Sequence, residues 1–119
     1  MRRIKTLKKN YEFKNVLNKG KFYTGKQIIV YINNNKSNEN IIGIAVSSKV
    51  GKAVKRNHIK RLIRESYYYI KKEKLEYGHN IVFVWNKKID IKKANYHIIK
   101  KDMENIFKKA NLIKKDEEK

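Results

Sequence analysis

A run of five apolar residues, Ile81 to Trp85, constrains the possible folds of this chain more than any other feature. A strand with one solvated face alternates apolar and polar side chains, whereas an unbroken apolar run is typical of an interior strand covered on both faces. The rest of the chain therefore has to supply neighbouring strands and the helices that cover this one.

Two further strands are predicted before this run. Residues 22–33 are expected to form a single strand, because residues 28–32 are β-branched and aromatic. Residues 41–50 are expected to form a second strand. The polar loop between them is short, which predicts that these two strands pair as a hairpin.

Three helices complete the predicted order. They are expected over residues 11–18, capped by Asn10, over residues 53–74 and over residues 90–112, with a turn at residues 76–80. The order α-β-β-α-β-α predicts an α+β fold, a two-layer sandwich of helices on a small sheet. The 119 residues are expected to form a single domain, with a flexible basic segment over residues 1–9 and a flexible tail over residues 114–119.

The charge of the chain points to a polyanionic partner. Lysine and arginine number 31 against 11 acidic residues, a net charge of +20 whose self-repulsion opposes folding. Nucleic acid and an anionic membrane are the two candidates. No apolar stretch approaches the roughly 18 residues of a membrane span, and no apolar region follows the basic start, as a signal peptide requires. We therefore expect a cytoplasmic protein without a membrane partner or a small-molecule substrate, and the absence of cysteine excludes thiolate metal sites.

The helix predicted over residues 53–74 has an apolar side and a basic side. At about 100° per residue, one side carries Ile59, Leu62, Ile63, Ser66 and Ile70. The other carries Arg56, Lys60 and Arg64 at i, i+4 and i+8, with Asn57 and Arg61 beside them, while Lys49, Lys52 and Lys55 precede it. Three of the chain's five arginines lie here, and arginine offers a planar fork of donors that suits phosphate.

This basic side is predicted to bind nucleic acid. No acidic residue occurs between Lys49 and Arg64, although like charges at i, i+4 repel by roughly 0.2–0.5 kcal/mol per pair. Phosphate would relieve that repulsion and release counterions. The alternative interpretation is an ordinary solvated surface.

The segment over residues 47–65, SSKVGKAVKRNHIKRLIRE, resembles the signature of the bacterial ribonuclease P protein subunit. That family has a Ser-Lys-Lys-like strand end, a glycine, Ala-Val, and Arg-Asn-Arg continuing as Ile-Lys-Arg-Leu-hydrophobic-Arg. The resemblance begins at Leu7-Lys8-Lys9-Asn10 and runs through Phe13, Gly20 and the Tyr31 strand to the last helix. Three positions depart from it: His58 replaces the second arginine, Ser48 replaces a common lysine, and Leu17 replaces a frequent aromatic residue.

The resemblance implies a fold and a function beyond what periodicity can indicate. It implies a left-handed βαβ crossover, and a protein that joins ribonuclease P RNA and helps to remove the 5′ leader of precursor tRNA. The chemistry would belong to the RNA and to Mg²⁺ held mainly by RNA and substrate, so no catalytic residue and no metal site is expected in the chain.

The resemblance also implies two binding surfaces. The catalytic RNA would dock on Arg56, Asn57, His58, Lys60, Arg61, Arg64, Lys52 and Lys55. The leader would lie in a cleft lined by Phe13, Leu17, Tyr31, Ser47 and Lys49, where aromatic faces could stack on bases of any sequence.

Four alternatives remain open from the residues alone. Phe13 and Tyr31 fit ordinary core packing as well as a cleft. A structural RNA-binding protein, of the ribosomal or RNA-chaperone type, would share the same charge. A membrane-surface helix is disfavoured because the apolar side is needed to cover the sheet. An autonomous nuclease would have to use His58, His79 and His97, since the acidic residues are scattered.

Overall fold

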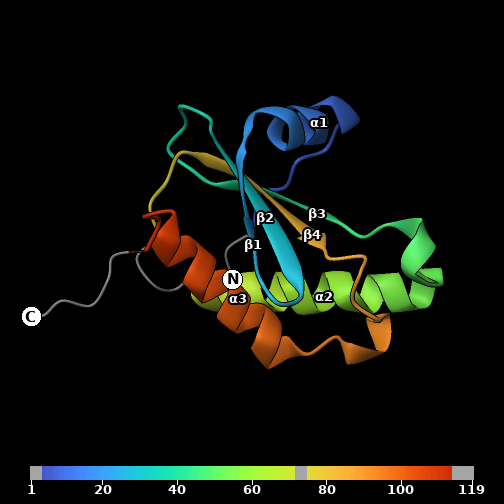
Figure 1. Ribbon diagram of the computed structural model, residues 1–119. Coiled ribbons are helices and arrows are strands. Elements are labelled where there is room, and N and C mark those ends of the chain that lie inside the picture. The colour runs from blue at the N-terminus through green and yellow to red at the C-terminus, as the bar shows by residue number, and fades with distance from the viewer. Residues whose placement is uncertain (1–3, 72–74, 114–119) are drawn as a thin grey trace, which may run out of the picture.

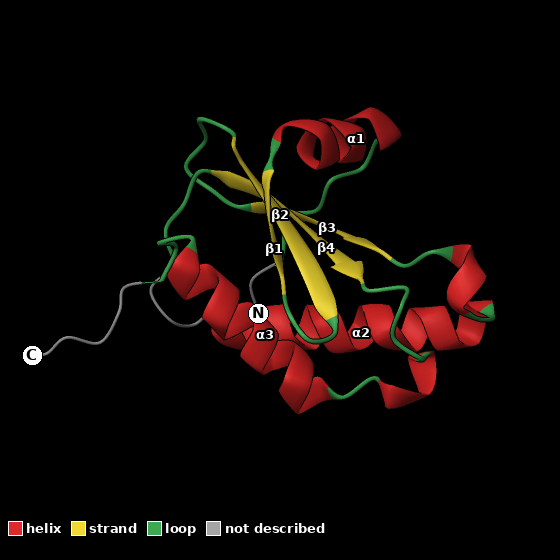
Figure 2. Cartoon of the chain, viewed as in Figure 1, coloured by secondary structure: helices red, strands yellow, loops and turns green. Residues whose placement is uncertain are grey.

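The computed structural model describes residues 4–71 and 75–113, and in this part helices lie on both faces of a four-stranded sheet (Figure 1). The elements, coloured by type in Figure 2, are α1 (Asn10–Lys19), β1 (Lys21–Thr24), β2 (Ile28–Asn34), β3 (Ile41–Ala45), α2 (Ala53–Ile70), β4 (His79–Trp85) and α3 (Tyr96–Lys109). Short 3-10 turns occur at Ser48–Val50 and Ile91–Lys93. Residues 72–74 of the predicted helix, and parts of both ends predicted to be flexible, lie outside the described residues.

The apolar run forms an interior strand, as predicted. The strand order is β1-β2-β4-β3, so that β4 pairs antiparallel with β2 and parallel with β3. Ile81, Val82 and Phe83 are fully buried. Helix α2 connects the two parallel strands, which confirms a βαβ unit, whereas its handedness stays an implication of the family resemblance.

Two strand predictions were wrong. Residues 22–33 form two antiparallel strands, β1 and β2, because the chain turns at residues 25–27. The turn is held from a distance: the buried carboxylate of Asp102 on α3 accepts the backbone N–H groups of Lys26, Gln27 and Ile28. The expected hairpin of β2 with β3 is also wrong, because β4, apolar on both faces, inserts between them and takes the covered position. Strand β3 ends at Ala45, not at residue 50.

The helix boundaries differ from those predicted for local reasons. Asn10 does not cap α1, since it is already helical, and the carboxylate of Glu12 instead accepts the N–H groups of Lys8 and Lys9 at 2.9 Å each. These bonds lower the pKa of Glu12. The last helix begins at Tyr96, not at residue 90, because the side chain of Asn95 caps it.

Two apolar clusters fill the two faces of the sheet. The larger one packs β2 and β4 against α2 and α3, and the rings of Tyr67, Phe83 and Phe107 lie 5.7–6.4 Å apart in this cluster. Trp85 is 1% exposed and Phe107 is fully buried, as expected of core residues. The smaller cluster, Leu7, Val16 and Val82, lies under α1 on the opposite face (Figure 1).

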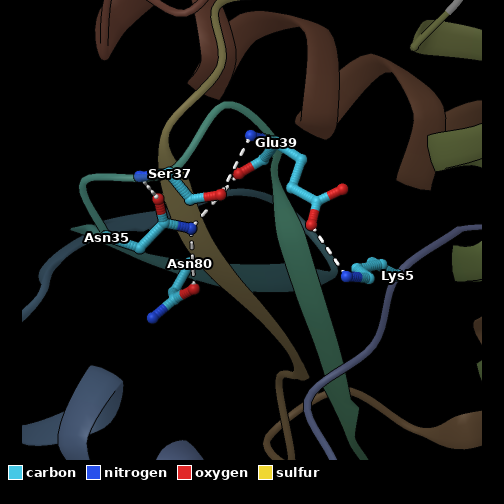
Figure 3. Close-up of polar contacts among 5 residues, drawn as sticks. All are labelled: Lys5, Asn35, Ser37, Glu39 and Asn80. Carbon is cyan, nitrogen blue, oxygen red and sulfur yellow. Dashed lines mark hydrogen bonds and ion pairs between the residues drawn. The ribbon is translucent and has the colours of Figure 1, made fainter.

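Part of the basic N-terminal segment runs beside β3. The backbone N–H of Leu7 donates to Ile42, and the N–H of Ile42 donates to the carbonyl of Lys5. The Lys5 ammonium forms an ion pair with the Glu39 carboxylate at 2.8 Å (Figure 3). Glu39 lies in the loop after β2, where the side-chain amide of Asn35 donates to the backbone carbonyl of Glu39 and to the side-chain oxygen of Asn80. These contacts depend mainly on the backbone bonds and on buried Leu7, because an exposed ion pair contributes little, and the flexibility of residues 1–9 stays a prediction. No helix in the described ranges is long and apolar enough to cross a membrane.

Candidate nucleic-acid interface

Helix α2 separates an apolar side from a basic side. Four of the five residues predicted to face the sheet are buried, Leu62 is half-buried, and Tyr67 joins them at 3% exposed. The predicted RNA-docking residues lie outside this buried set. They are half-buried (Arg56 and Lys60) or exposed (Asn57, His58, Arg61, Arg64, Lys52 and Lys55).

The three arginines of α2 are in different environments. Arg56 donates from Nη1 to the carbonyl of Gly51 at 3.0 Å, so part of its guanidinium fastens the start of the helix. Arg61 is paired with Glu65 at 3.0 Å, which relieves some of the repulsion that we expected to be uncompensated. Arg64 is exposed and makes no ion pair or hydrogen bond with the described residues.

Lys60 and Arg64 face the edge of β3. They lie one helical turn apart, and both line a groove of about 710 Å³ that follows this edge. His58 is two residues before Lys60, about 200° around the helix, so it points away from the groove. His58 therefore lies apart from the stripe formed by Arg56, Lys60 and Arg64.

The groove brings together residues that were predicted for two different surfaces. Lys60 and Arg64 come from the predicted RNA-docking side, and Phe13 comes from the predicted leader cleft. The other lining residues are Ile4, Thr6 and Leu7 of the N-terminal segment, Ile42, Gly43 and Ile44 of β3, and Glu65 and Tyr68 of α2.

Two of the residues predicted to line the leader cleft pack against the same apolar cluster. Phe13 and Tyr31 are half-buried and pack on the small cluster under α1. A side chain at Gly43 would collide with the Phe13 ring, with a Cβ only 2.5 Å from its nearest atom. Leu17 is 37% exposed on α1. Core packing thus accounts for part of the Phe13 and Tyr31 side chains, and both remain partly accessible.

Ser47 and Lys49 lie beyond the end of β3 and are not part of that cluster. The hydroxyl of Ser47 accepts the backbone N–H of Lys49 at 3.2 Å and begins the 3-10 turn before α2. This bond gives Ser47 a local structural role, and the side chain of Lys49 is exposed.

An exposed aromatic residue of this face was missed from the sequence. Phe22 of β1 lies opposite Tyr31 in the strand register, with ring centroids 5.8 Å apart, and is 64% exposed. A single strand over residues 22–33 cannot bring these two residues together. The available signal was Gly25 followed by two polar residues, a turn pattern between two runs of strand formers.

The three histidines lie on three separate elements, α2, β4 and α3. Within the described ranges, no group of three or more His, Asp or Glu side chains could hold a metal ion. Nδ1 of His79 is buried without a hydrogen-bond partner. Burial lowers the pKa of His79, and the backbone and carboxylate of Glu76 oppose this in part.

Comparison with known proteins identifies relatives over nearly the whole chain. The Ribonuclease P family model matches residues 1–111. The ribonuclease P protein component of Clostridioides difficile is 39% identical over 110 residues, covering 92% of this chain and 95% of that protein. The solved RNase P protein of Staphylococcus aureus has a TM-score of 0.77 at 31% identity, covering 94% of this chain and 100% of that one. That of Thermotoga maritima has a TM-score of 0.77 at 25% identity, covering 88% and 96%.

Proposed function

Because the chain belongs to the ribonuclease P protein family, and so acts as the protein subunit of an endoribonuclease that contains RNA, we propose that it holds two RNAs on two faces. The basic side of α2 docks on the ribonuclease P RNA. The sheet face beside α1 holds the 5′ leader of precursor tRNA. The leader is then removed to give the mature 5′ end.

The observation that carries this proposal is that α2 presents cations without acidic partners among the described residues, while a pair of accessible aromatic rings lies on the other face of the sheet. Arg64 and Lys60 are presented by α2 at the edge of β3, whereas Phe22 and Tyr31 pair on the sheet face beside α1. Cations without acidic partners suit the phosphates of a folded RNA. Accessible rings suit an unpaired strand, because every base has a face to stack.

The protein's contribution to the reaction is positioning. Stacking of leader bases on Phe22 and Tyr31, with α2 held on the catalytic RNA, would fix the scissile phosphate relative to the RNA's active centre. We assign Mg²⁺ to the RNA and the substrate, in keeping with the scattered carboxylates of the described residues. We place this activity in the cytoplasm, since the relatives are bacterial proteins.

The test is cleavage of a 5′-labelled precursor tRNA at low Mg²⁺. Three reactions are compared: a bacterial ribonuclease P RNA with this protein, the RNA alone and the protein alone. Cleavage at the mature 5′ end that requires both supports the proposal. Cleavage by the protein alone would identify an autonomous nuclease, and tight RNA binding without stimulation would identify a structural RNA-binding protein.

A further inference from the structure

Strand β3 is an edge strand that the N-terminal segment covers only in part. The N–H and C=O of Ile42 point away from β4 and bond with Lys5 and Leu7. Since such groups alternate along a strand, the N–H and C=O of Ile44 point the same way. No described residue bonds with them, so one donor and one acceptor face the groove that Ile44 lines.

One wall of the groove is positively charged. Lys60 and Arg64 stand one turn apart and have no acidic partner among the described residues. Glu65 also lines the groove, but its carboxylate accepts a hydrogen bond from Nε of Arg61 at 3.0 Å. The wall therefore offers two cations at the spacing of one helical turn, which suits a phosphate group.

The remaining lining suits a flat, partly apolar ring. Phe13 of α1 and Tyr68 of α2 contribute aromatic rings, and Ile42 and Gly43 contribute apolar surface. The volume of about 710 Å³ lies within the roughly 300–1,000 Å³ usual for pockets that bind small ligands. An extended peptide fits poorly, because strand addition needs several consecutive free edge groups and, within the described strand β3, only those of Ile44 are open.

We infer that this groove binds one unstacked nucleotide of the ribonuclease P RNA. The base would lie beside Phe13 and bond through its edge with the backbone of Ile44, while Lys60 and Arg64 hold its phosphate. Unpaired nucleotides of folded RNAs are splayed out and recognised in this way. This inference rests on the proposed function, and the catalytic RNA is chosen over the leader because both cations belong to the docking side of α2.

Crosslinking tests the identity of the occupant. The chain has no cysteine, so Thr6→Cys at the groove can carry a single azidophenacyl label, and Asn105→Cys on the exposed side of α3 is the control. Labelled proteins are irradiated in the holoenzyme, with and without precursor tRNA, and the crosslinks are mapped by primer extension. We expect the label at position 6 to crosslink to one or two unpaired nucleotides of the catalytic RNA that the label at position 105 does not reach. Crosslinks to the leader, or the same weak pattern from both positions, would overturn the inference.

Filling the groove tests its contribution to binding. Thr6→Trp should weaken binding of the catalytic RNA roughly tenfold, the loss expected for one stacked base, while Asn105→Trp at the exposed control position on α3 should leave it unchanged. The salt dependence of binding should also flatten by about one counterion, because the displaced nucleotide takes its phosphate away from Lys60 and Arg64. Circular dichroism and thermal unfolding establish whether the tryptophan variant is folded. The crosslinking experiment uses other variants, so it still tests the inference if the tryptophan variant does not fold.

Different results would refute the groove assignment and the proposed function. Unchanged affinity of a folded Thr6→Trp variant would refute the groove assignment, even with cleavage still stimulated. Absence of stimulation by the unmodified protein would refute the proposed function itself.

Discussion

Asp102 should be the residue on which the β1–β2 turn depends. Its side chain is 5% exposed, and its two oxygens accept the N–H groups of Lys26, Gln27 and Ile28 at 2.9, 2.8 and 3.2 Å. Each hydrogen bond to a charged group contributes roughly 1.5–3 kcal/mol, but such values are not additive, and losses above about 4–5 kcal/mol are exceptional. We expect Asp102→Ala to lower the free energy of unfolding by about 3–5 kcal/mol.

Asp102→Asn should be milder and more informative. The remaining carbonyl oxygen can still accept two of the N–H groups, while the new NH₂ group opposes the third donor. We expect a loss of about 2 kcal/mol, which for a chain of this size lowers Tm by roughly 8 °C. Urea unfolding can be followed by the fluorescence of Trp85, the single tryptophan, which is 1% exposed.

Glu104→Gln is the matched control. It removes the same charge from the same helix, at a side chain that makes no hydrogen bond with the described residues. Any general effect of one negative charge in a protein of net charge +20 is therefore common to both variants. If the free energies of unfolding of Asp102→Asn and Asp102→Ala both lie within about 0.5 kcal/mol of that of the control, the carboxylate does not hold the turn and the reasoning is wrong.

Three further predictions concern the binding surfaces and the pH dependence of stability. Replacing Arg61 and Arg64 with alanine should weaken binding of the catalytic RNA and flatten its salt dependence by about one counterion per lost phosphate contact; an unchanged slope would mean that another face binds. Phe22→Ala should weaken binding of a precursor with a long leader about tenfold and spare one with a single-nucleotide leader, as measured by Kd; equal losses would indicate a structural defect. Burial lowers the pKa of His79 from 6.5, so the unfolded chain binds the proton more readily and stability should fall as the pH drops below about 6.5. His79→Gln should remove that part of the decline in urea midpoints between about pH 5 and pH 8, and an unaltered decline would exclude His79 as its source.

Sequence patterns correctly predicted the elements that depend on residues close to one another along the chain. The apolar run identified β4 as the interior strand, and the spacing of Ile59, Ile63 and Ile70 identified the buried side of α2. The turn between β1 and β2 was missed because Asp102, which holds it, lies 74–76 residues away along the chain. The position of β3 is likewise a tertiary property: a short loop favours a hairpin, but the insertion of β4 covers more apolar surface.

The side-chain contacts of the candidate site were also only partly predictable from the sequence. The sequence shows the position of every arginine along α2, but it does not show that the Arg56 guanidinium donates a hydrogen bond to the carbonyl of Gly51. The pairing of Arg61 with Glu65 at i, i+4 could have been predicted. The groove could not, because it exists only where the N-terminal segment, the edge of β3 and α2 meet.

Three of the described carboxylates accept hydrogen bonds from backbone N–H groups and do not neutralise the cations of the groove. This explains how a chain with few acidic residues can fold and still attract RNA. Asp102 holds the β1–β2 turn, Glu12 caps α1, and Asp90 accepts the N–H of Lys92, so these three hold backbone and leave the cations of the groove unpaired. Stability and RNA affinity should therefore respond to different residues. Asp102→Asn should lower the free energy of unfolding without altering the salt slope of RNA binding, and Arg64→Ala should flatten that slope with little effect on unfolding. If either substitution changed both quantities, folding and RNA binding would draw on the same charges, and the separation argued from these contacts would fail.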